Sequence, residues 1–304
     1  MRDFRLGTFS PSVLVEVATA IGRFADVGLS VTEVPATSSP QQFTDLFAGE
    51  LDAALTNPDN VIAYRCVAAN PLRRTGDVRI LSAVDRGLGL SLFTASDDAD
   101  LGRVRGGTVA VDAPGSGFAF VALELLARRG LWAGADFTVA SLGSTPRRAR
   151  ELLAGTCRAT VLNAGNDLLA ESRGAHRHDS VGSIGPYVGA VLAATGAALE
   201  KDRDALRCVV RVLREIGAEL VRGEHRELAI GAARQRLALD ENDARRYLDT
   251  LVDPEHGIVP DGRLGAAELA TLVELRNRHR PDDPALSPDQ VLASGLVDES
   301  LLSA

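Results

Sequence analysis

Polar loops that follow short apolar runs carry the residues best suited to chemistry. The segment 112–117 (DAPGSG) is the most informative, because a predicted strand, a glycine-rich turn and a helix start together form a concavity that can hold an anion. The hydroxyl of Ser116 and nearby backbone amides would be the donors. With only Gly115 and Gly117, the loop is not a dinucleotide fingerprint, and it lacks the Gly-Lys-Ser/Thr of a phosphate-binding loop.

Hydroxyl and amide side chains occupy the corresponding loops elsewhere in the chain. Each of them has two interpretations, since serine, threonine and asparagine also cap helices and turns. Arg86 either clamps an anionic ligand or pairs with its neighbour Asp85, and Tyr187 either faces the ligand or packs at a hinge. The candidate ligand-binding residues are Ser10, Ser12, Ser38, Thr56, Asn57, Arg86, Ser116, Gly117, Ser144, Asn163 and Tyr187.

Titratable groups are scarce in these loops. The five histidines lie elsewhere, so the candidates for acid–base catalysis are Asp59, Asp85 and Asp112. Lys201 is the only lysine, which leaves little room for Schiff-base chemistry. No metal or other cofactor is expected, because Cys-x-x-Cys is absent and the pair His176 and His178 is interpreted as solvated surface.

Composition excludes several classes of protein. In 304 residues, 45% are hydrophobic, enough to bury a large core, and the net charge of −8 argues against a nucleic-acid partner. No segment is apolar over the roughly 18 residues of a membrane span. The first residues do not match an export signal, so we expect a cytoplasmic protein as the sequence stands and an extracytoplasmic one if a signal segment was trimmed.

Two consecutive series of alternating strands and helices must position the loops. The second series begins near residues 87–89 and ends near residues 186–189, where the chain crosses back to the first lobe. We therefore expect an α/β protein of two lobes, with residues 1–88 and 188–304 in lobe I, 89–187 in lobe II, and a helical C-terminal segment. The predicted strands are 4–9, 29–34, 51–56, 78–84, 88–94, 108–112, 137–142, 159–162 and 188–194.

Four segments in order carry a resemblance to a known family. GTFSPSVLVEVATAIGRFADVGLSVTEVP, GELDAALTNPDNVIAYR, GGTVAVDAPGSGFAFVALELLARRGL and LLAGTCRATVLN resemble solute-binding proteins of the nitrate, sulfonate and taurine type, a family that also includes thiamine-pyrimidine synthases. The likeness spans about residues 4–195. It implies a type II periplasmic-binding-protein-like fold with a ligand cleft between the lobes.

The resemblance leaves two functions open. One is the substrate-binding protein of an ABC transporter, which would bind a small polar, anionic molecule and have a permease as partner. The alternative is a cytosolic enzyme, a lyase or dehydratase acting on a small carboxylate or heterocycle. The cysteine-rich iron motif of the thiamine branch is absent, and Ser10 and Ser12 occupy the region where desulfinases of this fold carry a nucleophilic cysteine.

Overall fold

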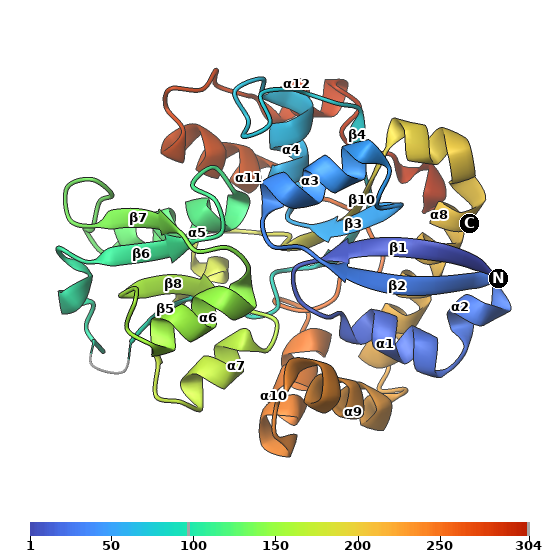
Figure 1. The fold of residues 1–304 in the computed structure, drawn as a ribbon, viewed down its shortest axis with the longest axis horizontal. Helices are drawn as coiled ribbons and strands as arrows, with labels where there is room; N and C mark the ends of the chain where they lie inside the picture. Colours follow the sequence, from blue (N-terminus) through green and yellow to red (C-terminus); the bar gives the residue numbers. More distant parts are fainter. Residues whose placement is uncertain (96–97, 303–304) are drawn as a thin grey trace.

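Two five-stranded mixed sheets lie side by side, each covered by helices (Figure 1). The computed structural model describes residues 1–95 and 98–302. The strand order is β2-β1-β3-β10-β4 in the first sheet and β7-β6-β8-β5-β9 in the second. In each sheet the first three strands run parallel, and an antiparallel strand follows them. This arrangement confirms the predicted α/β class with two lobes.

The strands of the first sheet come from two segments of the chain, one before and one after the segment that forms the second sheet. It contains β1 (Arg2–Thr8), β2 (Leu29–Pro35), β3 (Ala53–Thr56), β4 (Val78–Asp85) and β10 (Ala190–Thr195). Its helices are α1 (Val13–Ala20), α2 (Arg23–Asp26), α3 (Ser39–Ala48), α4 (Pro58–Cys66) and the long α8 (Gly196–Val221).

The second sheet is built from one continuous stretch of chain. Its strands are β5 (Ser91–Thr94), β6 (Thr108–Val111), β7 (Thr138–Ser141), β8 (Ala159–Leu162) and β9 (His176–Ser180). The stretch also contains α5 (Gly117–Ala127), α6 (Thr145–Leu153), α7 (Asn166–Glu171) and the 3-10 turns η1 (Gly102–Val104) and η2 (Val181–Ser183). The strand β9 was not predicted, because its sequence HRHDS has no apolar alternation.

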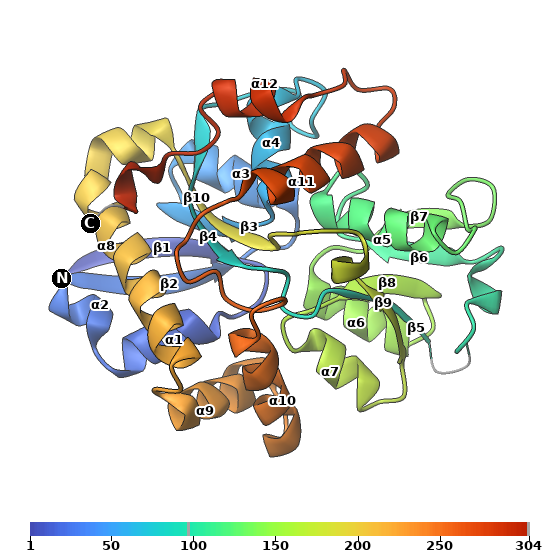
Figure 2. The same cartoon turned by 180° about the vertical axis from the view of Figure 1, so that it is seen from behind.

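The C-terminal segment is helical, as the sequence predicts. It contains α9 (Arg226–Leu237), α10 (Glu241–Val252), α11 (Ala266–His279), α12 (Pro288–Ala293) and a last 3-10 turn η3 (Glu299–Leu301). Figure 2 shows α11 reaching from the side of the first sheet across to α5 of the second. In the described part of the chain, no helix has both the length and the apolar character needed to cross a membrane.

One hydrophobic core continues through both halves of the molecule. It joins Val61 of α4 and Val191 of β10 to Leu92 of β5, Val109 of β6 and Phe120 of α5. All five side chains are almost completely buried. The two sheets therefore share packed apolar contacts, in addition to the chain crossings between them.

The two chain crossings touch each other. Gly87, with φ of 105°, lies on the outward crossing, and Gly189 lies on the return. A Cβ added at Gly189 would lie 2.3 Å from the Cα of Gly87, so only glycine permits this approach. We propose the division into lobe I (1–88 and 188–304) and lobe II (89–187) because it follows the sheet to which each strand belongs.

Candidate functional site

A cavity of about 110 Å³ lies where the carboxyl ends of strands from both sheets meet. Its wall comes from the loops after β1, β3, β4, β6 and β8, the start of β10, and helices α6 and α10. Such strand ends are the usual ligand position in open α/β sheets. Eight predicted site residues line the cavity: Ser10, Ser12, Thr56, Asn57, Asp85, Asp112, Ser116 and Asn163.

Three of the residues that line the cavity also cap helices. The side chains of Ser12, Asn57 and Ser116 accept hydrogen bonds from backbone N–H groups in the first turns of α1, α4 and α5. The helix-cap interpretation therefore holds for all three side chains. The start of each helix is fixed by a side chain that also faces the cavity.

The other predicted residues lie outside the wall of the cavity. Ser38 caps α3, and Ser144 precedes α6 without a side-chain capping bond. Arg86 lies outside the cavity wall and donates to Glu268 at 3.0 Å, so the ion pair that it forms is with Glu268 and not with Asp85. Asp59, 1% exposed, accepts two hydrogen bonds from Arg276 at 2.7 and 2.8 Å, which commits its carboxylate to a structural ion pair.

Tyr187 and Gly117 do not line the cavity, but both contact Asn57, which does. The side-chain amide of Asn57 donates to the Tyr187 hydroxyl at 2.8 Å and to the carbonyl of Gly189 at 3.2 Å. Gly117 packs so closely from the other lobe that a Cβ there would lie 2.0 Å from Oδ1 of Asn57. Asn57 is thus held in one orientation by groups from both sides of the cleft.

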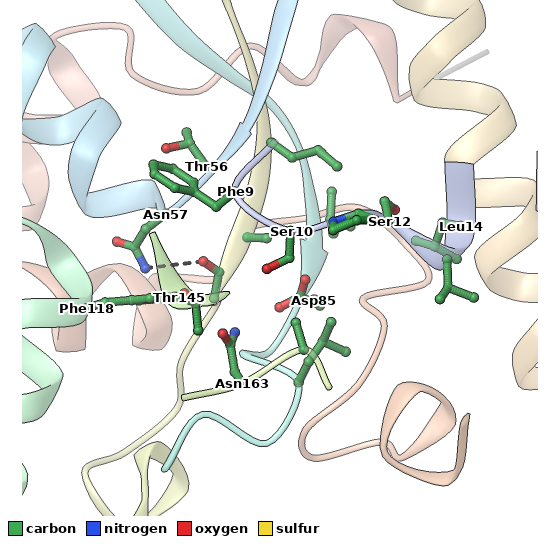
Figure 3. A pocket seen from close by; sticks show the side chains of 18 of the residues that line it. Phe9, Ser10, Ser12, Leu14, Thr56, Asn57, Asp85, Phe118, Thr145 and Asn163 are labelled. Atoms are coloured by element: carbon green, nitrogen blue, oxygen red, sulfur yellow. Dashed lines mark hydrogen bonds between the residues drawn. The ribbon is translucent and has the colours of Figure 1, made fainter. Parts of the chain in front are cut away.

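Asp85 is a buried carboxyl group that faces the cavity. Its Oδ1 accepts a hydrogen bond from the backbone N–H of Gly87 at 2.7 Å. Burial raises its pKa to about 6, and the N–H groups of Gly87 and Ala190 oppose this shift only partly. Figure 3 shows the side chains of Ser10, Asp85 and Asn163 facing one another across the pocket.

Arg148 is the main residue of the wall that the sequence did not identify. It is 1% exposed, and its guanidinium donates to Thr145 and Thr160 and to the carbonyls of Gly143 and Val161. Burial lowers its pKa, while the nearby carboxylate of Asp112 opposes this. The sequence signal that could have identified Arg148 is its position three residues after Thr145, since this spacing places both side chains on the same face of a helix.

Apart from Asn60, apolar side chains form most of the rest of the wall. Phe9, Leu14 and Phe118 come from loops or helix starts near the predicted ones, whereas Tyr247 and Leu251 come from α10. No sequence pattern links α10 to loops more than 80 residues away, so this contribution could not be predicted. The arrangement suits a small molecule with polar groups at one side and an apolar body.

Other reactive side chains lie away from the cavity. None of the three cysteines or five histidines lines it, and burial raises the pKa of the Cys157 thiol to about 11. Among the residues that the structure describes, one group could hold a metal ion, formed by Glu219, Glu224 and His225. It lies at the junction of α8 and α9, outside the cleft.

Comparisons with known proteins define the fold. No family model and no curated protein matches the sequence. In structure the chain is similar to the alkanesulfonate-binding protein SsuA from Xanthomonas axonopodis bound to MOPS, with a TM-score of 0.74 and 19% identity over 97% of this chain and 98% of that one. It is also similar to the periplasmic nitrate-binding protein NrtA from Synechocystis, with a TM-score of 0.75 and 13% identity over 98% and 86%.

A third similar structure is an enzyme. The desulfurization enzyme DSZB has a TM-score of 0.64 and 13% identity over 99% of this chain and 98% of its own. At these identities the likeness establishes the fold alone: this chain has the periplasmic-binding-protein fold. The resemblance to nitrate- and sulfonate-binding proteins read from the sequence is confirmed at that level.

Proposed function

We propose that this protein binds a small polar solute in the cleft between its two lobes, as the substrate-binding component of an ABC import system. The observation that carries the proposal is the cavity itself, whose wall takes polar groups from both sheets. The periplasmic binding proteins of the same fold support an extracytoplasmic location and a permease as partner.

The charge of the solute is a separate question. The sequence predicts an anion, and an anion needs free donors or a cation. In the cleft Arg148 already donates to four groups of the protein, and Arg86 turns away to Glu268. These two arginines therefore do not favour an anion, and the proposed function names the solute as small and polar without assigning its charge.

Native mass spectrometry of the purified protein, combined with thermal unfolding in the presence of small polar solutes, tests this function. A solute at about 100 times its Kd should stabilise the protein by about 2.7 kcal/mol. The proposal fails if the protein carries no solute and none of the compounds raises its Tm.

A second candidate function, an enzyme, is supported by one observation. Asp85 combines burial, access to the cavity and a pKa of about 6, which is the range of a general acid or base. A solute that the wild type converts and the Asp85→Asn variant binds but leaves unchanged would establish catalysis. A bound solute recovered intact after prolonged incubation with the wild type would exclude it.

A further inference from the structure

Four helices that begin at the cleft already meet a carboxylate of the protein. At α1, Glu33 accepts the backbone N–H of Ser12 at 2.8 Å, and at α7, Asp167 accepts that of Gly165 at 3.0 Å. Asp59 lies in the first turn of α4, and Asp112 accepts the hydroxyl of Ser116 at the start of α5. The positive ends of these helices are therefore occupied by the protein's own acids, which leaves little for an anionic ligand.

Each of these four carboxylates also has an arginine. Glu33 pairs with Arg236 at 2.8 Å, Asp59 with Arg276 at 2.7 Å and Asp167 with Arg177 at 2.8 Å. Asp112 interacts electrostatically with the buried Arg148. The charges around the cleft are balanced in this way, as buried charges require.

Asp85 differs from all four. In the described part of the chain, no arginine, lysine or histidine forms an ion pair with it, and its hydrogen-bond donors are backbone N–H groups. It is nonetheless 93% buried, since its exposed fraction is 7%, and its carboxylate faces the cavity. The cation that the other carboxylates receive from the protein is missing here.

Asn163 supplies a second acceptor beside Asp85. Its Nδ2 donates to the carbonyl of Gly87 at 2.9 Å, so its Oδ1 is the atom left to face a ligand. Ser10 completes the group, with its Oγ accepting from Asn166 of the other lobe at 3.3 Å. Two acceptors and one hydroxyl around a single point suit a group with several N–H donors.

We propose that the solute presents a cationic N–H group, such as a protonated amine, to Asp85 and Asn163, with its apolar part against Phe9 and Phe118. This inference rests on the proposed solute-binding function and names the chemical class of its ligand. Binding would complete the charge balance around the cleft, because the ligand takes the place that an arginine occupies beside each of the other carboxylates.

Matched compounds of two sizes test the proposal by calorimetry and thermal unfolding. They are ethylamine and benzylamine, the corresponding alcohols ethanol and benzyl alcohol, and the anions ethanesulfonate and benzenesulfonate. We expect an amine to bind at least tenfold more tightly than the alcohol and the sulfonate of its size. Asp85→Asn should weaken amine binding at least tenfold and alcohol binding less than twofold. Asp249→Asn removes one exposed carboxylate from α10 and should leave amine binding unchanged.

Several results would overturn the proposal, and they can be told apart from a failure of the function. Tighter binding of a sulfonate than of its amine, or unchanged amine binding by Asp85→Asn, rejects a cationic ligand and keeps solute binding. If no compound binds, native mass spectrometry of the purified protein decides. A carried solute with a basic nitrogen supports the proposal, a carried solute without one rejects it, and the absence of any solute rejects the binding function itself.

Discussion

The burial of the Asp85 carboxyl beside the cavity lowers the stability of the folded protein at neutral pH. Its pKa is about 6 in the folded protein, against an ordinary value of 3.8. Between these two pH values the carboxyl is protonated in the folded state and ionised in the unfolded state. Its contribution to stability is therefore lost as the pH rises from about 4 to about 6, and it stays lost above that.

Asp85→Asn should stabilise the ligand-free protein at high pH. Two pKa units correspond to up to about 3 kcal/mol, so we expect a gain of that order in the free energy of unfolding at pH 8 and little change at pH 4. Urea unfolding at the two pH values measures this gain. Asp249→Asn provides the control for the loss of one negative charge, and equal stability of wild type and Asp85→Asn at pH 8 would contradict the expectation.

Gly117 offers a test of the close contact between the lobes. In Gly117→Ala the new Cβ would overlap Oδ1 of Asn57, so we expect a loss of about 1–3 kcal/mol in stability, typical of overpacking. The loss of solute affinity should accompany it, because Asn57 must move. Gly115→Ala, two residues away with open space around its Cβ, should unfold at the same urea concentration as the wild type. Equal losses in the two variants would show that the backbone of the turn before α5, and not the contact with Asn57, is responsible.

At the scale of elements, α11 ties the two lobes together through buried charges. Arg276 of α11 pairs with Asp59 of α4 and donates to the carbonyl of Gly115, just before α5. Glu124 of α5 in turn accepts from Arg278 at 2.8 Å and contacts the ring of His279 at 3.1 Å. Helix α11 therefore fixes the relative position of two loops that line the cavity.

Breaking the buried pair should destabilise the protein strongly. Arg276→Met leaves Asp59 as an uncompensated buried charge, and we expect a loss of about 3–5 kcal/mol in the free energy of unfolding. Adding Asp59→Asn removes that charge and should recover most of the loss, which chemical denaturation of the single and double variants will measure. Arg245→Met, which breaks an exposed pair with Glu241, should cause no measurable change. A double variant as unstable as Arg276→Met would refute the explanation.

The alternation of apolar strands and amphipathic helices predicted most elements correctly, because it is a local property of the chain. It failed for β9, where pairing with β5 at the edge of the sheet decides the conformation of a polar segment. Loops at strand ends predicted much of the cavity wall for the same local reason. Arg148, Tyr247 and the pairing of Asp59 with Arg276 depend on how distant segments meet, and no spacing in the sequence encodes that.

At the scale of the whole molecule, the shared core predicts that the two lobes unfold together. Trp132 is the only tryptophan and lies in the second lobe, so its fluorescence reports on that lobe, whereas far-ultraviolet circular dichroism reports on all helices. We expect the two signals to give the same midpoint in urea. Two separated transitions would show that the lobes are independent in stability despite their common core.

The position of β10 also has a consequence for synthesis. This strand lies inside the first sheet, between β3 and β4, yet it is made after every strand of the second sheet. On the ribosome, the second sheet can close once residue 180 has emerged, while the first must wait for residue 195 before β3 and β4 have a common neighbour. The lobe that is translated first is thus the one completed last, and during that interval its unpaired strands are open to aggregation and to chaperones.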